Sequence, residues 1–237
     1  MLAQTKRDLA QLEDPDRAKN LSRFFKTGKG QYGEGDIFLG IPVPEQRKVA
    51  KKHINLSLND LQELLNSKIH EHRFTALLIL VSKYRKAEES LKEEIFCFIL
   101  KNTENINNWD LVDLSSPRII GDYLLNREKS ILYKLAKSTS LWERRISIIS
   151  TFKFIDNNDF KDALKISELL LHDEHDLIHK AVGWALREIG KRNQNLEEKF
   201  LNKHYSYMPR TMLRYAIEKF DEKKRQNYLN KNTTLTV

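Results

Sequence analysis

The sequence predicts an all-α protein built as a solenoid of repeated helix pairs. Apolar residues recur at helical spacing through almost every segment, and β-branched runs with a period of two are absent. A similar apolar helix returns every 34 to 36 residues and carries a basic or aromatic residue in its first turn. These residues are Arg73, Trp109, Arg145, Lys180 and Arg214. A period of this length is typical of paired-helix repeats, which bury their apolar faces by stacking on one another.

Four apolar segments give the strongest helical signals, and polar clusters separate them from their neighbours. The four segments are residues 73–84, 91–100, 146–154 and 181–189. Asn59 or Asp60 is the expected N-cap of an earlier helix, and Gly190 is an expected C-cap. We expect one domain over residues 1–230, followed by a frayed tail at 231–237.

The segment from Lys26 to Asp36 interrupts the helical pattern and holds four of the eight glycines. Its residue order does not fit the phosphate-binding loop G-x-x-x-x-G-K-[ST], and no predicted strand precedes it. We expect a mobile loop or a short hairpin between helices. Either it closes over bound nucleic acid through Lys26 and Lys29, or it is a plain connection.

Composition places the chain among compact proteins. The 237 residues are 40% hydrophobic, which is enough for a core, and no long uncharged apolar run predicts a transmembrane helix or a signal peptide. The lone cysteine, Cys97, lies in the apolar run at 95–100 and is expected to be buried. A single cysteine forms no internal disulfide, so we expect a reducing cytoplasmic location, in association with the nucleoid.

The net charge of +8 favours an anionic partner, and the repeat register predicts how the cations are distributed. We expect a C-shaped solenoid whose concave surface is basic and contacts successive phosphates of a duplex. The expected contacts are Arg73, Arg144, Arg145, Lys180, Arg187 and Arg214, with Lys26 and Lys29 from the glycine-rich segment. The alternative is that helix edges facing water simply carry charge.

One place in the repeat carries side chains that suit chemistry. Trp109 and Asp113 are four residues apart, so they share a helix face. Trp184 holds the position of Asp113 two repeats later, and Arg145 holds the position of Trp109 one repeat later. A carboxylate between indoles suits a transition state that gains positive charge, such as an oxocarbenium ion at a sugar C1′. If the departing base is already cationic, one carboxylate suffices.

Two other interpretations of individual residues stay open. The indoles are alternatively core aromatics, with Asp113 in a structural ion pair with Arg145 or Arg118. His172, His175 and His179 do not match H-E-x-x-H, and a helix start near His175 divides them. We therefore expect no metal site and no cofactor.

Three segments resemble the AlkD-type DNA alkylation repair proteins, which are DNA glycosylases built from HEAT-like repeats. The segments are Asn108-Trp109-Asp110-Leu111-Val112-Asp113, Trp142-Glu143-Arg144-Arg145 and Ala181-Val182-Gly183-Trp184-Ala185-Leu186-Arg187-Glu188. The stretch from Phe38 to Arg47 is similar to the family's early FLGI…PE-R stretch, and Arg214-Tyr215-Ala216-Ile217 is similar to its last repeat. The resemblance covers about Phe24 to Phe220.

The resemblance implies a HEAT-like solenoid and a monofunctional glycosylase that excises cationic N3- and N7-alkylpurines from duplex DNA without a metal or cofactor. Asp113 would stabilise the oxocarbenium sugar and position water, while Trp109 and Trp184 would contact the deoxyribose of the lesion. Arg145 would hold a backbone phosphate. The glycine-rich segment before Phe38 is longer than the connection typical of the active type. The alternatives are a non-catalytic binder of damaged or branched DNA and a protein-interaction scaffold. We expect a monomer.

Overall fold

The computed structural model describes residues 1–231, and within them it is helical, with sixteen α-helices and no strand beyond one isolated bridge between Ile37 and Ile69. The predicted all-α class is therefore confirmed. The chain divides into two compact units, Met1–Ser115 and Ser116–Val237. Among the described residues, none of the helices is long and apolar enough to cross a membrane.

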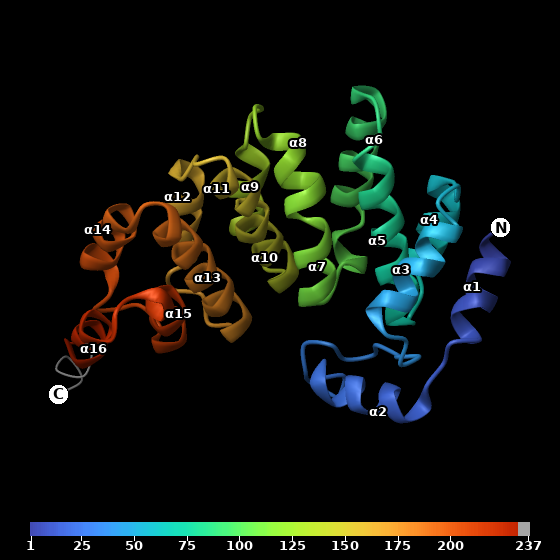
Figure 1. Cartoon of the computed structure of the whole chain (residues 1–237), viewed down its shortest axis with the longest axis horizontal. Coiled ribbons are helices and arrows are strands. Elements are labelled where there is room, and N and C mark those ends of the chain that lie inside the picture. The colour runs from blue at the N-terminus through green and yellow to red at the C-terminus, as the bar shows by residue number, and fades with distance from the viewer. Residues whose placement is uncertain (232–237) are drawn as a thin grey trace. The chain divides into compact units, whose positions relative to one another are not determined.

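The first unit is organised around one central helix (Figure 1). Its elements are α1 (Leu2–Ala10), α2 (Pro15–Phe24), α3 (Val43–Lys52), α4 (Leu58–Leu65), α5 (His70–Tyr84), α6 (Glu89–Lys101), the 3₁₀ turn η1 (Thr103–Asn105) and α7 (Trp109–Ser115). The central helix α5 packs against α1, α3, α4, α6 and α7. Because neighbours surround it, every residue from His70 to Val81 is buried, including its charged ones.

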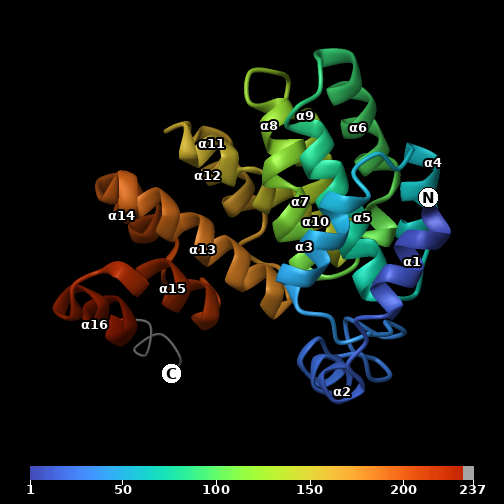
Figure 2. The same cartoon turned by 45° about the vertical axis from the view of Figure 1, so that its right-hand side comes forward.

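The short helix α2 and the glycine-rich segment after it lie at the end of the first unit that is opposite α6 (Figures 1 and 2). The segment is not a hairpin but a series of turns. The N–H of Gly33 donates to the carbonyl of Lys26 at 3.1 Å, and the N–H of Gly30 donates to the Glu34 carboxylate at 2.7 Å. A Cβ on Gly33 would lie 2.4 Å from the carbonyl oxygen of Phe25, so the close turn requires glycine there.

The second unit is organised around α13 (Asp176–Arg192). Its other elements are the π-helical turn η2 (Pro117–Gly121), α8 (Asp122–Leu124), α9 (Ser130–Ala136), α10 (Leu141–Ser150), α11 (Phe152–Asp156), α12 (Lys161–Leu169), α14 (Gln194–His204), α15 (Arg210–Ala216), η3 (Ile217–Lys219) and α16 (Glu222–Lys231). The helix α13 packs against α10, α11, α12, α14 and α15. A Cβ on Gly183 would lie 2.4 Å from the carbonyl oxygen of Met212, so α15 approaches the α13 backbone closely.

All five positions of the repeat lie in helices, but the expected helix ends need correction. Arg145, Lys180 and Arg214 are each the fifth residue of their helix, so their expected place in the first turn was wrong. The five positions of the repeat lie in α5, α7, α10, α13 and α15. Ser57, rather than Asn59 or Asp60, is the N-cap of α4, and Asp60 completes a capping box with it. Gly190 lies inside α13, which continues to Arg192, so its assignment as a C-cap was wrong.

Two further expectations from the sequence differ from the structure or lie outside it. Cys97 is exposed, so its expected burial was wrong. The buried residues of α6 are Ile95 and Ile99, and a residue midway between them points to the other side of a helix. The tail expected at 231–237 lies outside the described residues except for Lys231, the last residue of α16.

Candidate active site

In the first unit, the indole of Trp109 is held against a cluster of aromatic rings. Trp109 is the first residue of α7, and its backbone N–H donates to the side-chain oxygen of buried Asn108 at 2.9 Å. The ring of Phe25 stacks on the indole with centroids 5.2 Å apart, and the ring of Phe24 meets it edge-on at 6.0 Å. Phe38 stacks on the far side of Phe25 at 5.0 Å. Packing therefore restrains the half-buried indole of Trp109.

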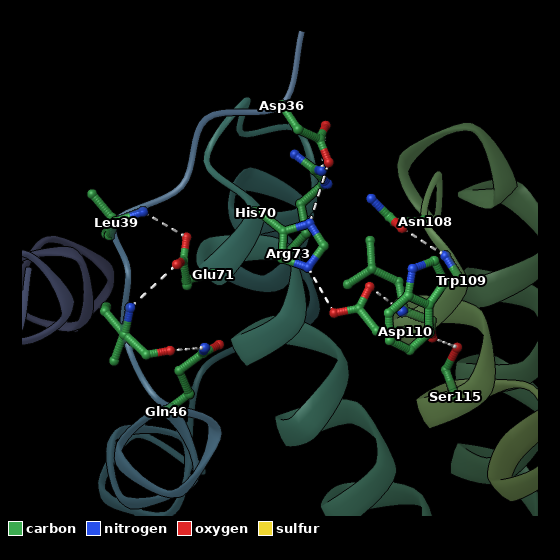
Figure 3. Close-up of polar contacts among 12 residues, drawn as sticks. Asp36, Leu39, Gln46, His70, Glu71, Arg73, Asn108, Trp109, Asp110 and Ser115 are labelled. Atoms are coloured by element: carbon green, nitrogen blue, oxygen red, sulfur yellow. Dashed lines mark hydrogen bonds and ion pairs between the residues drawn. The ribbon is translucent and has the colours of Figure 1, made fainter. Parts of the chain in front are cut away.

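A group of charged side chains, buried except for half-buried Asp110, lies beside Trp109 (Figure 3). We call it the His70 cluster, and it comprises Asp36, His70, Arg73 and Asp110. The imidazole Nε2 of His70 lies 2.8 Å from Asp110, and its Nδ1 lies 3.2 Å from Asp36. Arg73 completes the cluster with an ion pair to Asp36 at 2.7 Å. The cluster thus joins the glycine-rich segment, α5 and the first turn of α7.

The charges of the His70 cluster are set by their mutual contacts. Burial alone would lower the pKa of His70, but Asp110 and Asp36 outweigh it and raise the pKa to about 9. Burial likewise opposes ionisation of Asp36, yet the hydrogen bond from His70 and the charge of Arg73 lower its pKa. At neutral pH His70 is therefore an imidazolium whose two N–H groups donate to two carboxylates.

A second buried carboxylate holds the backbone that leads into α3. Glu71 accepts hydrogen bonds from the backbone N–H groups of Leu39 at 2.9 Å, Gly40 at 2.8 Å and Ile41 at 3.3 Å. The side chain of Gln46 donates to the carbonyl of Ile41 at 2.8 Å (Figure 3). Glu71 belongs to α5, so these contacts fasten to α5 the backbone that runs from Asp36 of the His70 cluster to the start of α3.

Asp113 lies one helical turn after Trp109 on α7, as the spacing predicts. Its side chain is half-buried, whereas its neighbours Val112 and Leu114 are buried. The carboxylate is therefore at the edge of the first unit and not in its core. The structure brings Trp109 and Asp113 together on one helix face.

In the second unit, Arg145 and Trp184 lie on the packed helices α10 and α13. Arg145 is only 5% exposed, and its guanidinium donates to the carbonyl of Leu177 at 2.6 Å. Trp184 is half-buried, its N–H donates to Glu188 at 3.2 Å, and the ring of Phe152 meets it edge-on at 4.5 Å. Each unit thus carries one indole of the predicted site, and the assembly of all four residues into one site stays a prediction.

The cations expected to bind phosphates fall into three groups in the structure. Arg73 is buried, since it pairs with Asp36 and donates to the carbonyl of Ser67 at 2.7 Å. It is therefore not presented to a phosphate, and we leave it out of the DNA contacts. Lys26, Lys29 and Arg214 are exposed.

Arg145 is buried like Arg73 and belongs with it, whereas the other expected cations form the third group, which carboxylates partly neutralise. Arg144 pairs with Asp173 at 2.6 Å, and Lys180 pairs with Asp176 at 2.7 Å. Arg187 forms an ion pair with Glu218. The predicted line of free cations along the repeat is thus interrupted by these pairs.

The three histidines of the second unit have separate structural contacts. His175 is the N-cap of α13 and accepts a hydrogen bond from the backbone N–H of Leu177 at 3.1 Å. The ring of His179 contacts the carbonyl of Asp173, and the ring of His172 stacks on Tyr207. Within residues 1–231, no group of three or more histidine, cysteine and acidic side chains is placed to hold a metal ion.

Sequence reasoning missed the His70 cluster and the phenylalanines that hold Trp109. A sequence signal exists for the latter, because Phe24 and Phe25 are adjacent aromatics directly before a glycine-rich segment. No comparable signal marks Asp36, His70 and Asp110, which are far apart in the chain.

The fold and these side chains define an α-helical repeat protein that presents indoles and a carboxylate on packed helices. The sequence profile of the family described as DNA alkylation repair enzyme matches residues 5–220. The chain therefore belongs to this family.

Solved structures with low sequence identity share the fold. The predicted DNA alkylation repair enzyme from Enterococcus faecalis is 16% identical with a TM-score of 0.69, over 89% of this chain and 97% of that one. The protein smu.31 from Streptococcus mutans UA159 is 16% identical with a TM-score of 0.52, over 92% and 98% of the two chains. AlkD2 from Streptococcus mutans is 16% identical with a TM-score of 0.51, over 99% and 96%. No curated protein matches the chain.

Proposed function

We propose that the protein is a DNA glycosylase that hydrolyses the N-glycosidic bond of cationic N3- and N7-alkylated purines in duplex DNA. One observation carries the proposal. A half-buried carboxylate, Asp113, lies one turn from a braced indole, Trp109, in a chain of the DNA alkylation repair family. We expect the reaction to need no cofactor, because the leaving base already carries the positive charge that an acid would otherwise supply.

The proposed reaction uses the chain's own side chains. The C1′–N bond breaks with its electron pair moving to the cationic base, which leaves neutral, and the sugar becomes an oxocarbenium ion. The Asp113 carboxylate stabilises this ion, and the faces of Trp109 and Trp184 favour positive charge near them. Water adds to C1′ and gives its proton to Asp113. Arg145 is buried and donates to the carbonyl of Leu177, so we assign it no direct phosphate contact in this reaction.

Release of free base from methylated duplex DNA tests the proposal. We expect the protein to liberate 7-methylguanine or 3-methyladenine, measured by chromatography, faster than spontaneous depurination of the same DNA without protein. Unmethylated duplex is the control, and it should release nothing. DNA binding without any release would instead support the alternative, a non-catalytic binder of damaged or branched DNA.

The contribution of Arg214 to DNA binding is a separate prediction. Arg214 is exposed on α15, and among residues 1–231 it has no ion-pair partner. We expect Arg214→Ala to weaken duplex binding at every sequence and to reduce the slope of log K against log salt by about 0.9. Fluorescence anisotropy between about 50 and 200 mM salt measures the slope.

Lys203→Ala is the matched control for Arg214→Ala, because Lys203 is an exposed cation of the same unit that pairs with Glu168 at 2.7 Å. It removes the same charge from a residue that is already neutralised. Equal salt slopes in the parent, Arg214→Ala and Lys203→Ala would show that Arg214 contacts no phosphate.

A further inference from the structure

A cleft of about 530 Å³ lies between α3 and the C-terminal half of α5, within the first unit. Arg47 and Lys51 line one side of it, and Arg85 and Lys86 line the other. Arg47 and Lys51 are four residues apart and therefore share a face of α3, while Arg85 and Lys86 follow the last residue of α5. Among residues 1–231, no carboxylate lines the cleft.

The floor of the cleft is apolar, which distinguishes it from a simple charged surface. Ala50, Ile54 and Leu78 lie between the cations, and Ala50 and Leu78 are buried. The hydroxyl of Ser82 donates to the carbonyl of Leu78 at 2.8 Å. The cleft therefore combines cations at its rim with an apolar strip between them.

The four cations are free of ion pairs in the part of the chain that the structure describes, whereas their neighbours on α3 are paired. Lys48 pairs with Glu45 at 2.7 Å, and Lys52 pairs with Asp8 at 2.7 Å. Folded surfaces usually intersperse both signs of charge, because clustered like charges repel one another. Four unpaired cations around one cleft thus create a local positive potential that an anionic ligand would relieve.

We propose that this cleft is a second DNA-binding site, which holds the sugar–phosphate backbone of a duplex away from the lesion. Phosphates contact the cations of the rim, and deoxyribose lies on the apolar floor. The cleft is distinct from the Trp109 site. His70, which lies beside Trp109, is the first residue of α5. The cleft residues Leu78 and Ser82 lie 8 and 12 residues further along the same helix, which is about 12 to 18 Å at the helical rise.

The site requires DNA binding but not excision, so its test uses undamaged DNA. The variant is Arg47→Ala with Lys51→Ala, and the matched control is Lys48→Ala with Lys52→Ala. Both double variants lose two charges from the same helix, but only the first loses the cations of the cleft. Circular dichroism and thermal unfolding establish that both are folded, and anisotropy titrations of an undamaged duplex of about 20 base pairs measure the salt slope.

We expect the cleft variant to bind the duplex several-fold more weakly than the control variant and to lose about one to two units of salt slope. Equal affinities and slopes for the two double variants would overturn the proposal. A second arm adds dAMP to the parent and to the cleft variant. Binding of dAMP that depends on the cleft, together with equal DNA binding by the two variants, would assign the site to a free nucleotide and also overturn the proposal.

A third arm separates this proposal from the glycosylase reaction. We expect the rate of base release from saturating methylated DNA to be the same in the parent and the control variant Lys48→Ala with Lys52→Ala, whose residues lie outside both sites. Absence of base release in the parent would contradict the proposed reaction and leave the binding comparison intact.

Discussion

Asp113→Asn is expected to lower the rate of base release by about 100-fold or more, with duplex affinity nearly unchanged. Asparagine keeps the size of the side chain and one oxygen acceptor, but it removes the negative charge that stabilises an oxocarbenium ion. A loss of this size is typical when one preorganised electrostatic contact is removed from a transition state. Single-turnover release of 7-methylguanine from a defined duplex, at protein concentrations above the Kd, measures the chemical step.

Glu45→Gln is a suitable control for Asp113→Asn, since Glu45 lies at the start of α3 and pairs with Lys48. It removes one negative charge outside the proposed site and should leave the release rate at the parent value. Release by Asp113→Asn at the parent rate would remove Asp113 from the reaction. Thermal unfolding of the parent and both variants should agree to within a few degrees, because neither residue is fully buried.

His70→Gln is expected to destabilise the protein by about 3 to 5 kcal/mol. The substitution removes a buried positive charge and leaves Asp36 and Asp110 without their shared partner. Because Asp110 is the residue next to Trp109 in the first turn of α7, we also expect slower base release, by about tenfold or more. Denaturant unfolding monitored by circular dichroism gives the free energy, and single-turnover release gives the rate.

The same cluster predicts how stability depends on pH. The folded pKa of His70 is about 9, above its ordinary value of 6.5, so its contribution is complete below pH 6.5 and is lost as pH rises to 9. The rise of the His70 pKa corresponds to about 3 kcal/mol in the free energy of unfolding. The lowered pKa of Asp36 acts in the opposite direction, and its contribution is lost as pH falls below about 3.8. The stabilisation that the His70 cluster contributes should therefore be greatest between about pH 4 and 6.5.

A second buried group changes protonation in part of the same pH range and needs its own control. Burial raises the pKa of Glu197 to about 8, so its contribution also falls as pH rises, from about 4.5 to 8. Glu197→Gln removes this effect and should retain the decline between pH 8 and 9. A decline between pH 6.5 and 9 that is as large in His70→Gln as in the parent would show that His70 is not its source.

Sequence reasoning succeeds where a regular pattern fixes geometry. The helical period places α5, α7, α10, α13 and α15, and a spacing of four puts Trp109 and Asp113 on one face. It fails for the His70 cluster, because its contacts join a loop, a central helix and a third segment through tertiary packing. No period relates residues that meet in this way.

The register also identified equivalent positions, but the phosphate contacts expected at two of them do not fit the structure. Arg73 and Arg145 occupy the same place in the repeat, and both are buried arginines that donate to a carbonyl beside a helix start, those of Ser67 and Leu177. An arginine that recurs with the repeat thus has a structural use, and recurrence alone does not indicate contact with DNA. Arg214, at the last such position, is exposed instead.

The anchorage of Leu39, Gly40 and Ile41 by Glu71 has a consequence for sequence divergence. All three contacts are made by main-chain N–H groups, which every residue except proline possesses. These bonds therefore require a particular side chain only at Glu71. Gly40 must remain glycine for a different reason, because a Cβ there would collide with the backbone of Asp14. Leu39 and Ile41 are buried in the core with Leu9 and Val49, so over evolutionary time these two positions can exchange apolar residues of similar size while the backbone keeps its course.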